Sequence, residues 1–253
     1  MKMNPLPLAA VLSLLIVPGA ATAQEDDETA YIYASYYECG MGQGDAVATL
    51  RDDWGAIVQS HMDAGHISAW GILTHNTGNP WSMAIYHVGE DLGELNTALD
   101  EGLSQYVADH PDQMQTLMSA CPRHEDYIWT TGPGSEAGAA VAQDRASAGM
   151  SVYYVCDEGR EAVADLIVEQ VMGPALDRQV QEGNLSSWGW ISHFVGGELR
   201  RALVMDGPDH AAILEGRNQV IEQTGEQAAL MAEFNNVCNG HQDVLWNIAV
   251  ARP

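Results

Sequence analysis

The sequence has almost no lysine, since Lys2 is the only one in 253 residues. The rest of the chain therefore sets nine arginines against 35 aspartate and glutamate residues, a formal charge of −26. A surface this acidic repels polyanions, so nucleic acid is excluded as a partner and an anionic membrane is disfavoured. Two explanations of the charge stay open: adaptation to a salty medium, and attraction to a basic partner or to cations.

Several motifs of known chemistry are also missing. The chain has no Gly-rich phosphate loop, no serine elbow, no H-E-x-x-H, no C-x-x-C-H haem attachment and no EF-hand loop. Its many carboxylates follow no spacing typical of a metal cage. We therefore predict no metal site, and no motif identifies a cofactor.

The N-terminus has the pattern of a secretory signal. Lys2 precedes the apolar run Leu6–Val17, and Ala21-Thr22-Ala23 follows as a cleavage site. No later apolar stretch is long enough to span a bilayer. We expect residues 1–23 to be a signal peptide and the mature protein to be periplasmic or extracellular, without membrane insertion.

Two matched stretches indicate an internal duplication. Trp70-Gly-x-x-x-His75 and Trp188-Gly-x-x-x-His193 lie 118 positions apart. The cysteines repeat too, because Cys39 and Cys121 are separated by 82 positions, as are Cys156 and Cys238. Three disulfide pairings are possible, and the equal spans favour one bridge inside each repeat. The boundaries are a first repeat over 24–131, a Gly/Ala/Ser linker over 132–149 and a second repeat over 150–253.

Hydrophobic periodicity gives each repeat the order β-α-β-β-α-β. In the first repeat, strands are expected over 31–39, 68–75, 81–88 and 126–131, with helical stretches starting near Asp45 and Asp91. The second repeat follows the same order, with Pro174 kinking its first helix or ending it early. This order resembles the ferredoxin-like unit in tandem, and more narrowly the dimeric α/β-barrel superfamily.

The resemblance implies an α+β fold in which two ferredoxin-like sheets pack as an intramolecular pseudo-dimer, forming an α/β barrel. In that fold the first and fourth strands of each unit are antiparallel neighbours. Cys39 would then lie near Cys121, and Cys156 near Cys238, which supports the pairing favoured by the spacing.

His75 and His193 are the first candidates for chemistry, with Trp70 and Trp188 as candidate ligand-binding partners. The resemblance implies a space between sheets, or between sheet and helices, that holds haem or small aromatic substrates. An imidazole there could act as an axial ligand or a general base. The alternative is that both histidines are structural residues at strand ends. Duplication preserves structural residues as readily as functional ones.

A second matched pair, His124 with Asp126, recurs as His241 with Asp243. The carboxylate can fix the tautomer of the imidazole. A polar cluster that closes a loop beside the disulfide is the competing interpretation. The half zinc sites Cys121-x-x-His124 and Cys238-x-x-His241 are discounted, because an oxidised cysteine offers no thiolate.

Two further pairs complete the candidate residues. Arg200 and Arg201 are candidate anion-binding residues, with salt bridges to neighbouring acids as the alternative. Trp81 and Leu199 hold matched positions beside the two hairpins, where exposed apolar side chains would form an interaction surface.

Two functions follow from these observations. The first is an exported, non-enzymatic module that binds a protein partner or a small molecule without a cofactor, for example as an extrinsic subunit of an envelope assembly. The alternative is a small barrel enzyme that acts on an aromatic compound or on haem, with His75 or His193 as the working residue. The missing catalytic motifs favour the first.

Overall fold

The computed structural model describes residues 29–40, 43–78, 80–135 and 146–252. The predicted signal peptide, 1–23, lies outside these ranges, as do residues 136–145 of the predicted linker. Strand β4 runs to Gly134 and strand β5 begins at Ala148, so regular structure enters the predicted linker from both sides.

The first half alternates strands and helices as expected. Its elements are β1 (Tyr31–Glu38), α1 (Gln43–Thr49), a π-helical turn (Leu50–Trp54), α2 (Gly55–Asp63), β2 (Ala69–Gly78), β3 (Met83–Gly89), α3 (Leu92–Asp109), α4 (Pro111–Ala120) and β4 (Arg123–Gly134). Asp91 caps α3 by accepting a hydrogen bond from the backbone N–H of Glu94. Helix α4 restarts at Pro111, which needs no N–H donor partner in the first turn of a helix.

The second half has the same order. Its elements are β5 (Ala148–Val155), α5 (Glu161–Ile167), a π-helical turn (Val168–Met172), α6 (Gly173–Glu182), β6 (Ser187–Val195), β7 (Arg201–Gly207), α7 (His210–Thr224), a 3₁₀ turn (Gly225–Gln227), α8 (Ala228–Val237) and β8 (Gly240–Arg252). The early end predicted at Pro174 is wrong. Pro174 follows the π-helical turn inside one unbroken helical stretch from Glu161 to Glu182, so its missing N–H leaves a carbonyl of the preceding turn without a helical donor but does not end the helix.

The strands close into one antiparallel barrel in the order β1-β3-β2-β8-β5-β7-β6-β4. Backbone pairing of β2 with β8, and of β4 with β6, joins the two halves. The prediction of an α+β barrel is thereby confirmed. The two sheets do not merely face each other, because their edge strands are hydrogen-bonded across both seams and leave no open edge.

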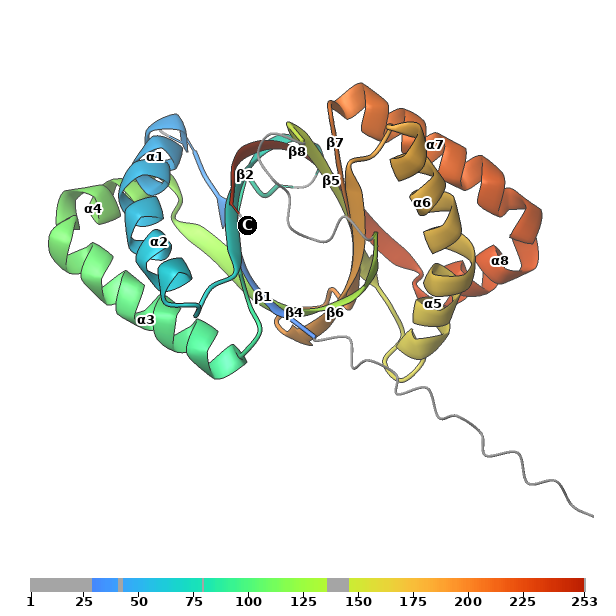
Figure 1. Cartoon of the computed structure of the whole chain (residues 1–253), viewed down its shortest axis with the longest axis horizontal. Helices are drawn as coiled ribbons and strands as arrows, with labels where there is room; N and C mark the ends of the chain where they lie inside the picture. Colours follow the sequence, from blue (N-terminus) through green and yellow to red (C-terminus); the bar gives the residue numbers. More distant parts are fainter. Residues whose placement is uncertain (1–28, 41–42, 79, 136–145, 253) are drawn as a thin grey trace, which may run out of the picture.

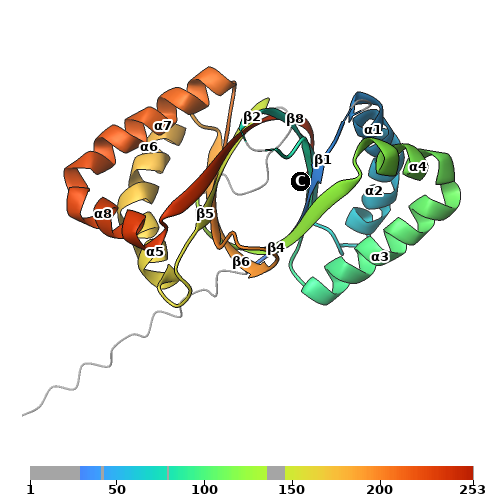
Figure 2. The same cartoon turned by 180° about the vertical axis from the view of Figure 1, so that it is seen from behind.

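Side-chain alternation along the strands separates the interior of the barrel from its two helix-covered outer faces. An aromatic cluster that includes Tyr36, Trp129, Tyr153 and Trp246 fills the interior. Helices α1 to α4 cover one side of the barrel and α5 to α8 cover the other, as both views show (Figure 1, Figure 2). Each helical layer forms its own core against the sheet.

Two disulfides join the predicted partners, Cys39 with Cys121 and Cys156 with Cys238. In each half one cysteine follows the first strand and the other precedes the fourth, and these strands pair antiparallel. The predicted pairing is confirmed. Within the described ranges, every helix is too short or too polar to cross a bilayer.

Candidate active site between the sheet and the helices of the first half

A cavity of about 290 Å³ lies between the sheet of the first half and its helices. Strands β1, β3 and β4 form its floor, and α3, α4 and the first π-helical turn form its walls. Most of its lining is apolar, with Leu99, Leu103, Met114 and Met118 among the helical residues. Leu103 and Met118 are half-exposed, so the apolar wall reaches the surface of the protein.

His87 lies in the wall of this cavity and is buried, with 5% of its surface exposed. Its Nε2 accepts a hydrogen bond of 3.1 Å from the indole N–H of Trp54. Since an indole only donates, Nε2 must be unprotonated and the ring proton must sit on Nδ1. Burial lowers the pKa of His87 to about 3, so the imidazole is neutral at physiological pH.

The rings around His87 hold it in place. Trp70 stacks on His87 at 6.3 Å between ring centroids, with an angle of 8° between the planes. Gly102 of α3 packs against Trp54, and a Cβ built there would approach the indole to 3.1 Å. The glycine therefore lets α3 lie close to the bulky indole.

Tyr106, on α3, also lines the cavity and is 1% exposed. Among the described residues its hydroxyl has no hydrogen-bond partner. The pKa of Tyr106 is raised to about 12, mainly by burial and secondly by the negative charge of Asp53, so the phenol stays protonated. The wall thus contains a second neutral group with a proton to donate.

A polar network forms part of the lining on β1 and β4. Asp126 accepts a hydrogen bond of 2.6 Å from the hydroxyl of Ser35, and its carboxylate lies 3.4 Å from Nε2 of His124. Tyr37 stacks on His124, with 5.3 Å between the ring centroids. The pair predicted from sequence is therefore part of a cavity wall, on the strand that follows Cys121 rather than in a loop.

The second half lacks this arrangement. Its π-helical turn and its strand β7 lie 118 positions after those of the first half, which aligns Trp54 with Met172 and His87 with Met205. Both methionines are buried in an apolar core. At the same offset, Gly102 corresponds to Val220. The polar pair and the glycine that accommodates it are specific to the first half.

The other matched pair differs as well. Asp243 lies 3.3 Å from Arg217 and 3.8 Å from His241. The carboxylate of the second half is thus paired with a permanent cation. In the first half, Asp126 lies beside the imidazole of His124 instead.

The arginine pair forms salt bridges. Arg201 makes a two-pronged contact with Asp165, at 2.7 and 2.8 Å, and Arg200 donates to Glu161 at 2.9 Å. Asp165 also accepts from the indole of Trp190 at 2.8 Å. The structure therefore contains the salt bridges of the alternative interpretation, in which carboxylates of the protein itself are the anionic partners of Arg200 and Arg201.

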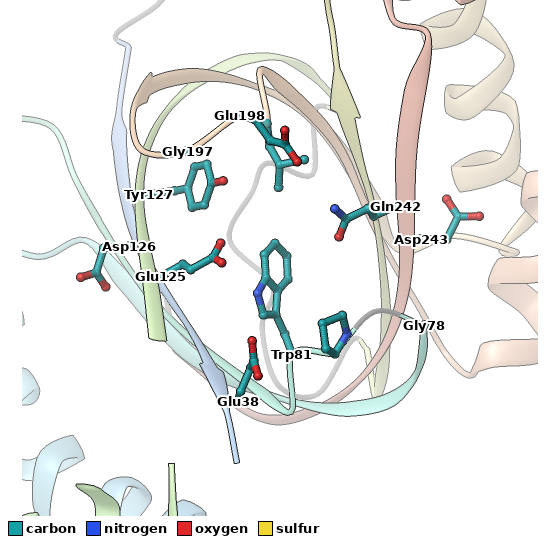
Figure 3. A pocket seen from close by; sticks show the side chains of 12 residues that line it. Glu38, Gly78, Trp81, Glu125, Asp126, Tyr127, Gly197, Glu198, Gln242 and Asp243 are labelled. Atoms are coloured by element: carbon teal, nitrogen blue, oxygen red, sulfur yellow. The ribbon is translucent and has the colours of Figure 1, made fainter. Parts of the chain in front are cut away.

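Trp81 and Leu199 lie inside the barrel rather than on an exposed surface. They are 4% and 2% exposed, which corrects the expected exposure. Trp81 turns inward because it stacks on Tyr36, with 4.2 Å between ring centroids. Figure 3 shows its indole in the barrel opening, with Glu38, Glu125 and Glu198 around it.

His75 and His193 do not line the cavity beside His87. The ring of His75 meets Trp246 edge-on at 6.5 Å, and His193 meets Trp129 at 6.2 Å. Their buried Nε2 atoms have no hydrogen-bond partner in the described part of the chain. The pKa of His193 is lowered, mainly by burial and secondly by the positive charge of Arg200.

Trp70 and Trp188 are 3% and 4% exposed and pack under the helices of their own halves. Trp188 donates its indole N–H to Asp177 at 2.8 Å. Of these two candidates, Trp70 contacts the candidate site through its stack on His87. A catalytic role for His75 and His193 stays a prediction.

Haem, the cofactor that the resemblance allows, does not fit the cavity beside His87. At His87 the Nε2 lone pair is taken by Trp54 and Nδ1 carries the proton, so neither nitrogen is free to bind iron. The cavity of about 290 Å³ is at the lower limit of ligand pockets, which span roughly 300–1,000 Å³. The cavity at the centre of the barrel, lined by Trp129 and Tyr153, is smaller still, about 110 Å³, whereas more open pockets of about 810 and 840 Å³ lie at the barrel opening around Trp81 and beside Trp188.

No family model matches the chain, and no curated protein matches it. Solved structures do, over most of their length. An anthrone oxidase-like protein is 11% identical, covers 90% of this chain and 94% of its own, and has a TM-score of 0.56. A putative monooxygenase from Fusobacterium nucleatum is 6% identical, with coverage of 88% and 94% and a TM-score of 0.62. A chlorite dismutase from Candidatus Nitrospira defluvii is 7% identical, with coverage of 87% and 91% and a TM-score of 0.55.

These structural neighbours are dimeric α/β-barrel proteins, as the sequence resemblance implies. At such low identity the likeness shows the fold. All three are named as enzymes, however, and this overturns the expectation of a non-enzymatic binding or interaction module. That prediction rested on the absence of a short catalytic motif, and such an absence does not exclude a catalytic site built from residues that are far apart in the sequence.

Proposed function

We propose that this protein is an enzyme that oxidises an aromatic compound bound in the cavity between the first-half sheet and α3 and α4. The observation that carries the proposal is His87, a buried, neutral imidazole in the wall of a largely apolar cavity. Burying a polar side chain is unfavourable unless its polar atoms form hydrogen bonds. Packing alone does not require a histidine here, since the second half has methionine at the same position. The names of the structural neighbours favour oxidation over other chemistry.

The polar residues suggest how the reaction would proceed. The His124–Asp126 pair would accept a proton from an activated C–H or O–H group of the substrate, with Ser35 holding the carboxylate. The resulting carbanion or phenolate would pass its electrons to molecular oxygen. For a ring CH₂ group the balanced result is a carbonyl group and one water. The apolar wall would keep water from the reacting carbon.

Two broader features belong to the same proposal. The two halves would be copies of one ferredoxin-like unit, which the 118-residue offset between matched elements supports. The enzyme would act outside the cytoplasm, in the periplasm or the extracellular space. The two disulfides support that location, because such bonds persist in oxidising compartments.

The first test blocks the cavity. Leu103 lines it and is 49% exposed, so Leu103→Trp should fill the entrance at little expense in folding free energy. Ile221 lies 118 residues later on α7 and is 52% exposed, which makes Ile221→Trp the matched control. With anthrone as the probe and an oxygen electrode as the readout, we expect enzyme-dependent oxygen uptake in wild type and in Ile221→Trp but not in Leu103→Trp. Equal rates in the two variants would contradict this location for the site.

The second test addresses the proton acceptor. Asp126→Asn keeps the size of the side chain but removes the charge that orients His124. We expect oxygen uptake to fall by roughly 10²–10⁴-fold, while anthrone binding, measured by equilibrium dialysis, stays within about two-fold. Asp243→Asn is the matched control in the second half. A loss of rate in both variants would point to stability rather than to chemistry.

A further inference from the structure

We propose that His87 recognises an uncharged oxygen acceptor on the substrate, so that the substrate is an aromatic carbonyl compound held through Nδ1–H. This inference rests on the proposed function and adds the group by which the substrate is oriented. It makes His87 a binding residue with a fixed donor, distinct from the proton-accepting pair on β4.

The direction of the Trp54–His87 hydrogen bond carries the argument. The indole N–H can only donate, so Nε2 accepts and Nδ1 keeps the ring proton. Among the described residues, Trp54 is the hydrogen-bond partner of the His87 imidazole, and it uses Nε2. Nδ1–H therefore remains as a donor in the cavity wall, where a ligand would have to supply the acceptor.

The charges in the cavity wall restrict which kind of acceptor group a ligand can present to His87. A neutral imidazole gives no Coulomb attraction to a carboxylate or a phosphate, and the lining contains Asp100 and Asp126 but no lysine or arginine. An anionic ligand would meet like charges and lose its hydration without compensation. A carbonyl oxygen accepts a hydrogen bond without bringing charge. The site should accordingly select a neutral aromatic ketone over an aromatic acid.

The test uses the matched probes 1-tetralone and tetralin, which share a bicyclic skeleton and differ in one carbonyl oxygen. Dissociation constants would be measured by equilibrium dialysis for wild type and for His87→Met, the residue present at the equivalent position in the second half. We expect wild type to bind 1-tetralone about 10-fold more tightly than tetralin. In His87→Met the preference should vanish or invert, because no donor then compensates the carbonyl.

A measurement on wild type covers the case in which the variant folds poorly. In ¹⁵N-labelled protein, the His87 resonances should show the neutral Nδ1–H tautomer, and adding 1-tetralone, but not tetralin, should shift the Nδ1–H proton downfield. An Nε2–H tautomer, or the same tetralone preference in His87→Met, would overturn the inference.

Blocking the entrance separates this failure from that of the proposed function. If Leu103→Trp abolishes binding of both probes while the carbonyl makes no difference, the cavity remains the binding site and only the recognition by His87 fails. If both probes bind to Leu103→Trp as tightly as to wild type, they bind outside this cavity. That result would overturn the proposed function as well as the recognition by His87.

Discussion

Trp54 donates its indole N–H to Nε2 of His87 across 3.1 Å, and both side chains are buried where the first π-helical turn meets strand β3. The contact joins residues 33 positions apart and fixes which nitrogen of the imidazole carries the proton. Trp70 stacks on the same imidazole. The orientation and the protonation state of His87 are therefore set by the fold before any ligand binds.

Removing the donor should destabilise the protein. In Trp54→Phe the apolar contact is largely kept, but Nε2 of His87 loses its partner inside the core. A buried acceptor left without a donor costs about 1–3 kcal/mol. Urea unfolding should show this loss. Trp188→Phe is the control for removal of an indole N–H, and we expect a smaller effect there, because its acceptor Asp177 is more accessible to water. An equal loss would mean that ring volume, and not the hydrogen bond, sets the stability.

The low pKa of His87 makes the folding free energy depend on pH with a defined sign. The pKa is about 3 in the folded protein, against about 6.5 when the chain is unfolded. As the pH falls below 6.5, the unfolded chain binds a proton that folded His87 does not. The free energy of unfolding therefore falls, by about 1.4 kcal/mol per pH unit, until the pH approaches 3.

The variant His87→Met isolates this contribution from that of the many carboxylates. Between pH 6 and pH 5 the difference in unfolding free energy between the variant and wild type should move in favour of the variant by about 1 kcal/mol. A flat profile for His87→Met would show that His87 takes up protons in the folded state.

Much of the fold was predictable because the sequence carries it in local patterns. Periodicity indicated the strands and helices, and the matched 82-residue spans of Cys39 to Cys121 and Cys156 to Cys238 predicted the disulfides. The seams β2–β8 and β4–β6 were not predictable in this way. Pairing between edge strands of different halves leaves no local signal, and both seams contain register shifts.

The candidate site was harder to predict because the internal duplication singles out residues that the two halves share, and the site residues are not among them. His75 and His193 match across the chain, as do Trp70 and Trp188, and matched residues include those that packing requires. Trp54 and His87 were missed because they have no polar counterpart, with Met172 and Met205 at the equivalent positions. The usable signal was this difference: a buried polar pair present in only one half of a symmetric fold needs a reason other than packing.

The salt bridge between Arg201 and Asp165 offers a test of the anion-binding interpretation. The side chain of Arg201 is only 11% exposed. Breaking such a pair by removing one partner costs about 3–5 kcal/mol, because the other charge is left uncompensated. We expect Arg201→Met to show a loss of this size in chemical unfolding, reduced by the partial exposure of Asp165.

The double variant Arg201→Met/Asp165→Val removes both charges and introduces the residues found 118 positions earlier, Met83 and Val47. It should recover part of the stability lost in the single variant, because the charge imbalance is gone but the buried indole N–H of Trp190 loses Asp165 as its acceptor. Inorganic phosphate should not stabilise wild type through this pair. A phosphate-dependent rise in melting temperature that Arg201→Met abolishes would restore the anion-site interpretation.

The disulfides should contribute separately in the two halves. Each closes a loop of 82 residues, and by the loop-entropy model such a bridge stabilises a protein by roughly 4–5 kcal/mol. Cys39→Ser/Cys121→Ser should therefore lower the free energy of unfolding by about that amount, and Cys156→Ser/Cys238→Ser by a similar amount. Since barrel strands from both halves pair across the seams, each loss should appear as a shift of one cooperative transition. Two resolved transitions in calorimetry would show instead that each half unfolds without the other, and that the seams contribute little to the cooperativity of the barrel.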